Sequence, residues 1–278
     1  MYCSGDIHGG NVIRPYNDKA GQPVVQVGLN NVRSAINWVK DQITAGYLAK
    51  KFSKFVVMGC SAGSLGTQLW ANELLNEFQW ENAAVVPDSC PGVFPDGSFA
   101  SIMHDVNFCD SGLLTPELVV KCRNKQLSLT AMNLRSMTNF PQVPFNYLES
   151  KTDWVQLAYY EVLAKSFNTP LQEITPVQFY NMTIDLFAEL NTRKNFLTYL
   201  INGEYHCFTP LPVHYTADTK GPEDNGLTSK SPMVYEWLNN LPLEQGKSLE
   251  SQCEVNLQQL ETTYCSPRVV PKQYTEQA

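Results

Sequence analysis

The alternation of hydrophobic and polar positions predicts a strand, a helix and a second strand in the first third of the chain. Apolar residues recur at helical spacing over 31–52, which indicates an amphipathic helix ahead of the first of these strands. The run 54–59 is short and apolar, as in a buried parallel strand, and 83–87 repeats this pattern up to Asp88. A helical pattern over 65–78 lies between the two runs. This order predicts a βαβ unit and therefore a parallel sheet.

The second half of the chain predicts further strands and helices for the same sheet. Residues 143–149 alternate as a strand does, and 195–201 form a last apolar run before a turn. Two helical patterns separate these strands, one that Thr152 caps and one around 179–190. A further helix is expected at 233–241.

Residues 90–142 interrupt the regular pattern. They are rich in Gly, Pro, Ser and Met and contain one short helical piece near 116–122. A connection of this length is uncommon in a compact sheet, so we expect an irregular, lid-like insertion with a functional role. The resulting prediction is one α/β domain over 1–241, with a mainly parallel sheet flanked by helices, and a polar tail over 242–278.

The composition excludes some classes of function. The 278 residues include 20 Lys+Arg and 27 Asp+Glu, which gives a formal net charge of -7. A sequence-independent nucleic-acid binder needs a basic face, so we expect no nucleic-acid partner. No apolar run approaches the roughly 18 residues of a membrane helix, so we expect no membrane span. The start of the chain has no signal-peptide pattern.

The cysteines and a sequon point to an extracellular setting. None of the eight cysteines stands in a C-x-x-C pair, which weakens zinc-ribbon and thioredoxin readings. Charged residues are only 17%, and together with the cysteines this is compatible with a secreted protein, which we expect to be a monomer. The sequence Asn181-Met182-Thr183 makes Asn181 a candidate glycosylation site.

A five-residue motif predicts a nucleophile. The chain reads Gly59-Cys60-Ser61-Ala62-Gly63, which fits the G-x-S-x-G elbow. In that elbow a tight turn between a strand and a helix exposes the serine hydroxyl, and small residues must flank it. The predicted strand before it and the predicted helix after it supply this context. We therefore expect Ser61 to be a nucleophile and the Ala62 amide to donate to an oxyanion.

A serine nucleophile needs a base and an acid, and in this fold the acid (Asp or Glu) follows the serine in the chain and the histidine base comes last. His206 lies five residues beyond the last predicted strand, where a loop at the carboxyl edge would present its imidazole. His214 also follows that strand, and we interpret it as a solvated surface residue. Asp153 and Asp88 are both candidates for the acid, since each follows a strand. We favour Asp153, whose alternative role is a helix first-turn aspartate. The alternative role of Asp88 is a strand-end aspartate that bonds loop amides.

Three segments resemble one known family. The segments 2–11, 59–66 and 206–207 look like those of the pectin acetylesterase/Notum family, and the match extends from residue 1 to about 241. The quoted residues are Tyr2-Cys3-Ser4-Gly5-Asp6-Ile7-His8-Gly9-Gly10-Asn11, Gly59-Cys60-Ser61-Ala62-Gly63-Ser64-Leu65-Gly66 and His206-Cys207. Asp153-Trp154-Val155-Gln156 resembles the acid segment of the family, and Pro87-Asp88-Ser89 resembles its Asp-Ser turn.

This resemblance implies an α/β-hydrolase fold and hydrolysis of a carboxylic ester without a cofactor or metal. Plant members deacetylate pectin, whereas the animal Notum branch removes a fatty acyl group from a signalling protein. The motif pattern looks closest to that of microbial and protist members. The implied partner is an acylated carbohydrate or another ester, and the implied location is outside the cell.

The resemblance also suggests roles for further residues. Cys109 and Cys122 resemble a cysteine pair in the family's insertion and are expected to form a disulfide. Asp6 and His8 are expected to line the pocket mouth together with Asp88, because two ligands without a third make a weak metal site.

Other cysteines are assigned less specifically. Cys60 is expected either as a buried thiol or bonded to a cysteine near it in space, with Cys207 as the candidate. The pair Cys253–Cys265 is a weaker candidate for a disulfide in the tail.

One family feature has no counterpart in the chain. Family members carry a glycine-rich segment upstream that supplies part of the oxyanion hole. We therefore expect an N-terminally truncated chain that lacks early strands, is poorly soluble and has little activity, because losing one oxyanion donor costs on the order of a hundred- to a thousand-fold in rate. The alternative is a non-catalytic protein that retains the residues of the triad.

Overall fold

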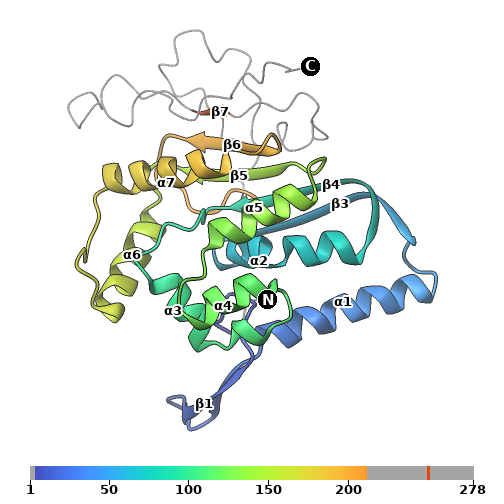
Figure 1. Cartoon of the computed structure of the whole chain (residues 1–278), viewed down its shortest axis with the longest axis horizontal. Coiled ribbons are helices and arrows are strands. Elements are labelled where there is room, and N and C mark those ends of the chain that lie inside the picture. The colour runs from blue at the N-terminus through green and yellow to red at the C-terminus, as the bar shows by residue number, and fades with distance from the viewer. Residues whose placement is uncertain (1–3, 212–248, 251–278) are drawn as a thin grey trace.

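The fold is built on a parallel sheet flanked by helices, as the pattern predicts. The computed structural model describes residues 4–211 and 249–250 (Figure 1). The sheet has the order β3-β4-β5-β6-β7, and each neighbouring pair is parallel. Its strands are β3 (Lys51–Cys60), β4 (Gln79–Asp88), β5 (Phe145–Ser150), β6 (Phe196–Ile201) and β7 (Leu249–Glu250). The strands β5 and β6 are buried at every residue, so they form the centre of the sheet.

The register brings the carboxyl ends of the strands to one edge of the sheet. Cys60 at the end of β3 pairs with Asp88 at the end of β4, and Asp88 pairs with Leu148 of β5. Ser150 pairs with Ile201 at the ends of β5 and β6. Residues that follow these four strands therefore meet at the same edge, which is where parallel sheets place their functional sites.

Seven α-helices and one 3-10 turn are present in the described residues. The α-helices are α1 (Gly28–Thr44), α2 (Ala62–Glu77), α3 (Ser98–Asp105), α4 (Pro116–Arg123), α5 (Leu129–Asn139), α6 (Trp154–Phe167) and α7 (Pro176–Leu190), and the turn is η1 (Phe108–Asp110). Figure 1 shows α1, α2 and α4 on one side of the sheet. No helix within the described residues is both long and apolar enough to cross a membrane.

Two hydrophobic clusters hold these layers together, and α2 contributes to both. Leu65, Leu69 and Trp70 pack into a cluster with α1 and the insertion helices. Ala71 and Leu75, further along α2, pack into a second cluster with the sheet, α5 and α7. Because α2 is buried on both sides, its first turn is held rigidly at the edge of the sheet.

The structure corrects two predicted boundaries. The first helix spans Gly28–Thr44 rather than 31–52, since Gly46 takes a left-handed φ of +81° and the chain then enters β3. The insertion 90–142 contains three α-helices rather than one: α4 confirms the helical piece predicted near 116–122, whereas α3 and α5 were not predicted. Local caps explain α4 and α5, because the Thr115 side chain accepts from the Leu118 amide and the Ser128 side chain accepts from the Ala131 amide. That the insertion acts as a lid stays a prediction.

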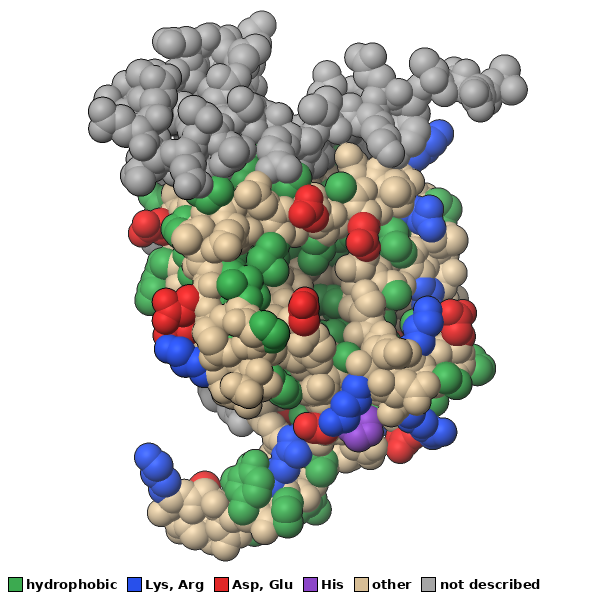
Figure 2. All heavy atoms as spheres, turned by 60° about the vertical axis from the view of Figure 1, so that its left-hand side comes forward, with side chains coloured by type: hydrophobic (Ala, Val, Ile, Leu, Met, Phe, Trp, Pro, Cys, Tyr) green, Lys and Arg blue, Asp and Glu red, His purple; other side chains and the backbone are tan. Residues whose placement is uncertain are grey.

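A two-stranded hairpin, β1 (Val12–Asn17) with β2 (Pro23–Gln26), projects from the body. Figures 1 and 2 both show it extending away from the helices. Ile13 is 70% exposed and Tyr16 57% exposed, so the hairpin presents apolar side chains to the surroundings. The sequence predicts at most a short strand at 24–27 here, because an isolated hairpin buries too little surface to leave a strong pattern.

Several predictions fall on residues that the structure does not describe. The helix at 233–241, His214 and the pair Cys253–Cys265 lie outside the described residues. Leu249 and Glu250, within the predicted tail, add strand β7 beside β6.

Candidate active site

Ser61 sits in a sharp turn between β3 and α2. Its backbone has φ 58° and ψ -121°, a left-handed conformation that is strained for a residue with a side chain. The turn is so tight that a Cβ at Gly59 would lie 2.4 Å from the carbonyl oxygen of Gly63. The Ser61 amide donates to the Asp88 carbonyl oxygen at 2.9 Å, which fixes the turn to the end of β4. This is the geometry of a nucleophile elbow.

The turn also leaves free donors beside Ser61. The amides of Ser64 and Leu65 donate to the Ser61 carbonyl oxygen at 2.9 and 3.2 Å. The amides of Ala62 and Gly63 donate no hydrogen bond to a backbone carbonyl of the described residues outside α2. They open α2, whose first amides have no partner within the helix. Partial positive charge therefore gathers next to the Ser61 hydroxyl.

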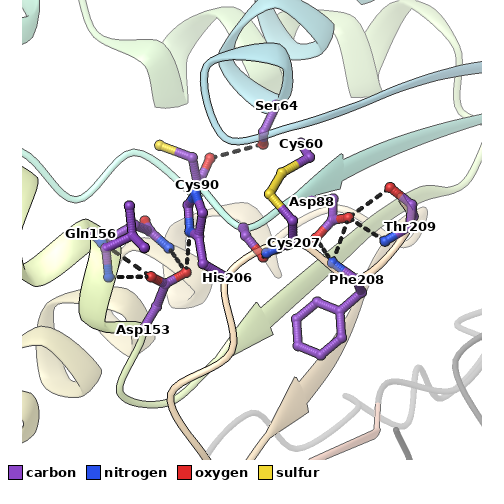
Figure 3. The surroundings of a disulfide bond; sticks show 12 residues. Cys60, Ser64, Asp88, Cys90, Asp153, Gln156, His206, Cys207, Phe208 and Thr209 are labelled. Atoms are coloured by element: carbon purple, nitrogen blue, oxygen red, sulfur yellow. Dashed lines mark hydrogen bonds and ion pairs between the residues drawn. A yellow bond between two sulfur atoms is a disulfide. The ribbon is translucent and has the colours of Figure 1, made fainter. Parts of the chain in front are cut away.

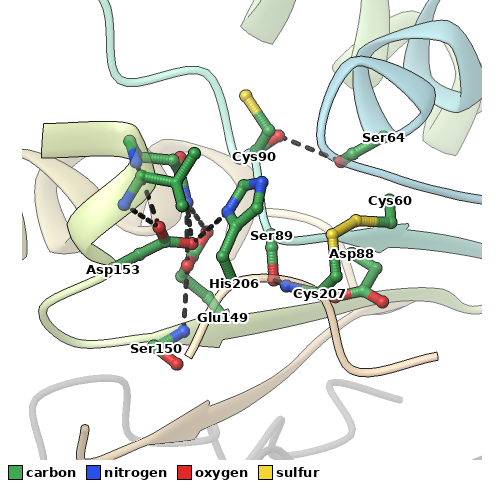
Figure 4. Close-up of polar contacts among 12 residues, drawn as sticks. Cys60, Ser64, Asp88, Ser89, Cys90, Glu149, Ser150, Asp153, His206 and Cys207 are labelled. Atoms are coloured by element: carbon green, nitrogen blue, oxygen red, sulfur yellow. Dashed lines mark hydrogen bonds and ion pairs between the residues drawn. A yellow bond between two sulfur atoms is a disulfide. The ribbon is translucent and has the colours of Figure 1, made fainter. Parts of the chain in front are cut away.

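His206 is paired with Asp153. Its Nδ1 lies 2.7 Å from Oδ2 of Asp153 (Figure 4), and the Asp153 side chain is fully buried while that of His206 is 14% exposed. The other carboxylate oxygen, Oδ1, accepts from the amides of Val155 and Gln156 at 3.0 Å each and caps α6. Asp153 is thus held by the helix on one side and holds the imidazole on the other.

Asp88 and Ser89 anchor the loop that carries His206. The Asp88 carboxylate accepts from the amide of Phe208 at 3.0 Å and from the amide and hydroxyl of Thr209 at 2.7 Å each (Figure 3). The Ser89 hydroxyl accepts from the Cys207 amide at 2.9 Å and donates to Asp88 at 2.9 Å. The Asp88 side chain is fully buried, and its predicted place at the pocket mouth stays a prediction.

A disulfide joins the residue before Ser61 to the residue after His206. Cys60 and Cys207 are bonded, with their Cα atoms 5.5 Å apart and a separation of 147 positions in the sequence. Of the two alternatives for Cys60, the bond to Cys207 is therefore confirmed. A ring nitrogen of His206 lies within 4.8 Å of both sulfur atoms. The bond fixes the separation between the elbow and the histidine loop.

The disulfide in the insertion is also present. Cys109 and Cys122 are bonded, with their Cα atoms 5.5 Å apart, as the resemblance implied. Among the described residues Cys90 is the one free cysteine, and burial raises the pKa of its thiol. The Cys90 carbonyl oxygen accepts from the Ser64 hydroxyl at 3.1 Å and from Gln68 Nε2 at 2.8 Å, which ties the segment after β4 to α2.

Sequence reasoning missed a second buried carboxyl beside Asp153. Gln156 Nε2 donates to both oxygens of Glu149 and to Oδ2 of Asp153, at 2.9 Å each. Burial, together with the Asp153 carboxylate, raises the pKa of Glu149 well above its usual range. Glu149 lies near the end of β5 and belongs to no motif. The one sequence signal for it is that a charged residue stands in an otherwise uncharged strand.

A cavity of about 720 Å³ opens beside His206. Trp154 and Tyr205 contribute to its wall and are 60% and 53% exposed. Glu204 also lines it. The cavity therefore offers two aromatic surfaces and one carboxylate next to the imidazole.

Asp6 and His8 lie in a loop that contacts the helices α1 and α2. Asp6 is 1% exposed, and its carboxylate accepts from the Gly28 amide at 2.6 Å at the start of α1. Its predicted position at the pocket mouth stays a prediction. The ring of His8 lies so close to α2 that a Cβ at Gly66 would be 2.7 Å from it, and burial lowers the pKa of the imidazole. Trp70 Nε1 donates to the His8 carbonyl oxygen at 2.9 Å. The loop thus packs on the helix behind Ser61.

Asn181 lies away from these residues, on α7. It lines a separate cavity of about 410 Å³ that also contains Asp96 and Asp185. Thr183, the third residue of the sequon, is 1% exposed. Glycosylation of Asn181 stays a prediction, and the burial of Thr183 means that attachment would have to precede folding.

No protein-family model matches the chain, and none of the curated proteins matches it significantly. The resemblance to the pectin acetylesterase/Notum family therefore rests on the motifs quoted above.

Proposed function

We propose that this protein is a serine carboxylesterase in which Ser61 is the nucleophile, His206 the general base and Asp153 the acid. The observation that carries the proposal is the 2.7 Å contact between His206 Nδ1 and Asp153. The residue that follows His206, Cys207, is bonded to Cys60, the residue before Ser61. The left-handed turn at Ser61 supports it, because strained backbone of this kind gathers at active sites.

The proposed reaction follows from these contacts. Ser61 Oγ attacks the ester carbonyl carbon, and Nε2 of His206 takes the hydroxyl proton and passes it to the leaving alcohol. Asp153 holds the Nδ1 proton and stabilises the imidazolium. Water then attacks the acyl-enzyme in the same way and releases the carboxylic acid. The Ala62 amide, at the start of α2, donates to the oxyanion of each tetrahedral intermediate.

The proposed substrate is an O-acetylated cell-wall polysaccharide such as pectin. This choice comes from the family resemblance, which also makes the reaction independent of cofactor and metal. The exposed rings of Trp154 and Tyr205 support it, since a sugar ring can pack its C–H face against an aromatic side chain. The two disulfides support the proposal that the protein works outside the cell.

The test is covalent labelling together with hydrolysis. A fluorophosphonate probe should label Ser61, and the protein should hydrolyse an aryl acetate. Ser61→Ala should abolish both, because no other hydroxyl would be activated. Ser53→Ala is the matched control, since Ser53 is an exposed serine on the same strand β3. Hydrolysis by Ser61→Ala at the rate of the wild type, or no labelling of a folded wild type, would overturn the proposal.

A further inference from the structure

Three metal-binding atoms meet at the candidate site. The sulfurs of Cys60 and Cys207 and a ring nitrogen of His206 lie within 4.8 Å of one another, and all three residues are partly exposed. In the disulfide each sulfur is bonded to the other, so neither is a thiolate. Reduction changes this, because two thiolates and an imidazole are a donor set that zinc prefers.

A dithiol can supply the two electrons and two protons that the reduction needs. The S–S bond breaks, two S–H bonds form, and the dithiol closes to its own cyclic disulfide. Exposure favours this bond over the other one. Cys60 and Cys207 are partly exposed, whereas Cys109 and Cys122 are only 6% and 0% exposed. Thiol exchange requires access to a sulfur, so the bond at the site reacts first.

We propose that reduction of the Cys60–Cys207 disulfide creates a divalent-metal site of the two-thiolate, one-imidazole type, formed by Cys60, Cys207 and His206. A tetrahedral zinc ion with bonds of about 2.0–2.3 Å places its ligand atoms roughly 3.3–3.8 Å apart. The donors already lie within 4.8 Å of one another, so small side-chain rotations suffice. Each thiol loses its proton to solvent as the metal binds.

The neighbours of His206 suit a metal ligand as well as a base. Nδ1 faces Oδ2 of Asp153 at 2.7 Å, which leaves Nε2 as the nitrogen that can bind a metal. A carboxylate that accepts from the second nitrogen of a ligating histidine is a common partner in zinc sites. In Figure 4 the imidazole stands between Asp153 on one side and the Cys60–Cys207 pair on the other.

The loop stays anchored when the disulfide opens. The Cys207 amide still donates to the Ser89 hydroxyl, and the Phe208 and Thr209 amides still donate to Asp88. These bonds keep His206 and Cys207 near Cys60 in the reduced chain. The donor set is therefore preorganised rather than dependent on the S–S bond.

Metal binding and base catalysis exclude one another here. Both use Nε2 of His206, so a bound metal removes the base from Ser61. This consequence for activity rests on the proposed esterase function, whereas metal binding itself does not. The oxidised protein would hydrolyse esters, and the reduced, metal-loaded protein would be inactive.

The test uses Co²⁺, which reports thiolate ligands through a charge-transfer absorption band. Wild-type protein is reduced with dithiothreitol, freed of it by anaerobic gel filtration and titrated with Co²⁺. We expect the reduced chain to bind a single Co²⁺ with this band and the oxidised chain to show none. Cys60→Ser/Cys207→Ser should lack the band, and the matched control Cys109→Ser/Cys122→Ser should retain it. Asp153→Asn should weaken Co²⁺ binding about 10- to 100-fold.

Two further measurements keep the outcomes distinct. Alkylation of the reduced wild type blocks the thiols without a substitution and should also remove the band. Zn²⁺ should prevent fluorophosphonate labelling of Ser61 in the reduced chain only, and a chelator should restore it. An equally strong Co²⁺ band in reduced Cys60→Ser/Cys207→Ser would overturn the metal site. A band without any labelling of the oxidised wild type would instead overturn the esterase and leave the metal site supported.

Discussion

At the scale of single residues, the two oxygens of Asp153 have different main roles, although Gln156 donates to both of them. Oδ1 caps α6 through the amides of Val155 and Gln156, and Oδ2 faces Nδ1 of His206. An asparagine caps a helix about as well as an aspartate. Substitution at this position can therefore separate the stability of α6 from the chemistry of the imidazole.

We predict that Asp153→Asn lowers kcat by about 10⁴-fold with little change in melting temperature, because the amide favours the wrong imidazole tautomer. Asp88→Asn should cost less in kcat but more in stability, since it weakens the bonds that the fully buried Asp88 carboxylate accepts from the amides of Phe208 and Thr209. Ester hydrolysis and thermal unfolding of both variants check this. The reverse order of the two kcat values would move the acid to Asp88.

Glu149 predicts a pH-dependent stability. Its folded pKa is raised well above the ordinary value of 4.5 by burial first and by Asp153 second. Between these two pKa values the folded state binds more protons than the unfolded state, so stability from this group is present below pH 4.5 and is lost as pH rises through the folded pKa. Glu149→Gln removes the titration. The free energy of unfolding of the variant relative to the wild type should rise by up to about 1.4 kcal/mol per pH unit above pH 4.5.

Urea unfolding of both proteins from pH 4 to pH 8 measures this difference. The groups that the two proteins share largely cancel in it. A difference that stays constant over the whole range would mean that Glu149 is ionised in the folded protein.

At the scale of elements, the strand–turn–helix unit from β3 to α2 is the part most sensitive to the size of its side chains. Its two motif glycines differ in their surroundings. A Cβ at Gly59 would meet the Gly63 backbone at 2.4 Å, whereas a Cβ at Gly63 would meet nothing within 4 Å. The motif therefore contains one obligatory glycine and one that space alone does not require.

We predict that Gly59→Ala displaces the turn and strongly lowers both stability and the rate of Ser61 labelling. Gly63→Ala should fold normally and gain about 0.5–1 kcal/mol in stability, because alanine is favoured over glycine in a helix. Chemical denaturation and fluorophosphonate labelling rates of the two variants provide the check. Equal behaviour of the two variants would contradict the packing at the elbow.

The elements also show what could be predicted from the sequence. The βαβ unit was predictable, because its runs are long, apolar and bounded by turn residues. Asp153 and His206 were predictable from their places after strands, and their contact follows from the shared carboxyl edge. The helix α4 was predictable near 116–122. The helices α3 and α5 were not, since α3 has eight residues and no side-chain cap and α5 depends on a local cap at Ser128. Asp88 as a strand-end aspartate that bonds loop amides was also predictable, whereas the contacts of Glu149 are long-range and local patterns do not encode them.

At the scale of the whole molecule, β3 is an edge. Within the described residues it pairs only with β4, and Val56 and Met58 on it are 39% and 49% exposed. The nucleophile strand is thus less protected than β5 and β6, whose residues are all buried. Rigidity at Ser61 therefore comes from α2, from Asp88 and from the disulfide rather than from strands on both sides.

The disulfide in the insertion should contribute to global stability without affecting the site. Cys109 and Cys122 are 13 residues apart, and closing a loop of this size contributes about 3 kcal/mol in the chain-entropy model. We predict that Cys109→Ser/Cys122→Ser lowers the free energy of unfolding by about this amount and leaves kcat unchanged. Denaturant unfolding and ester hydrolysis on the same preparation test both parts. A large fall in kcat in a folded variant would show that the insertion shapes the site.

The separation between Cys60 and Cys207 has a consequence for how the chain is made. At about 5–20 residues per second, a ribosome takes roughly 7–30 seconds to extend the chain by the 147 positions from Cys60 to Cys207. During that interval Cys90, Cys109 and Cys122 are synthesised, and each can form a disulfide with the free Cys60 thiol before Cys207 is added. An oxidising environment that acts on the nascent chain would therefore favour mispaired products. The yield of correctly bonded protein should depend on disulfide isomerisation after synthesis, at the two cysteines that flank the serine and the histidine.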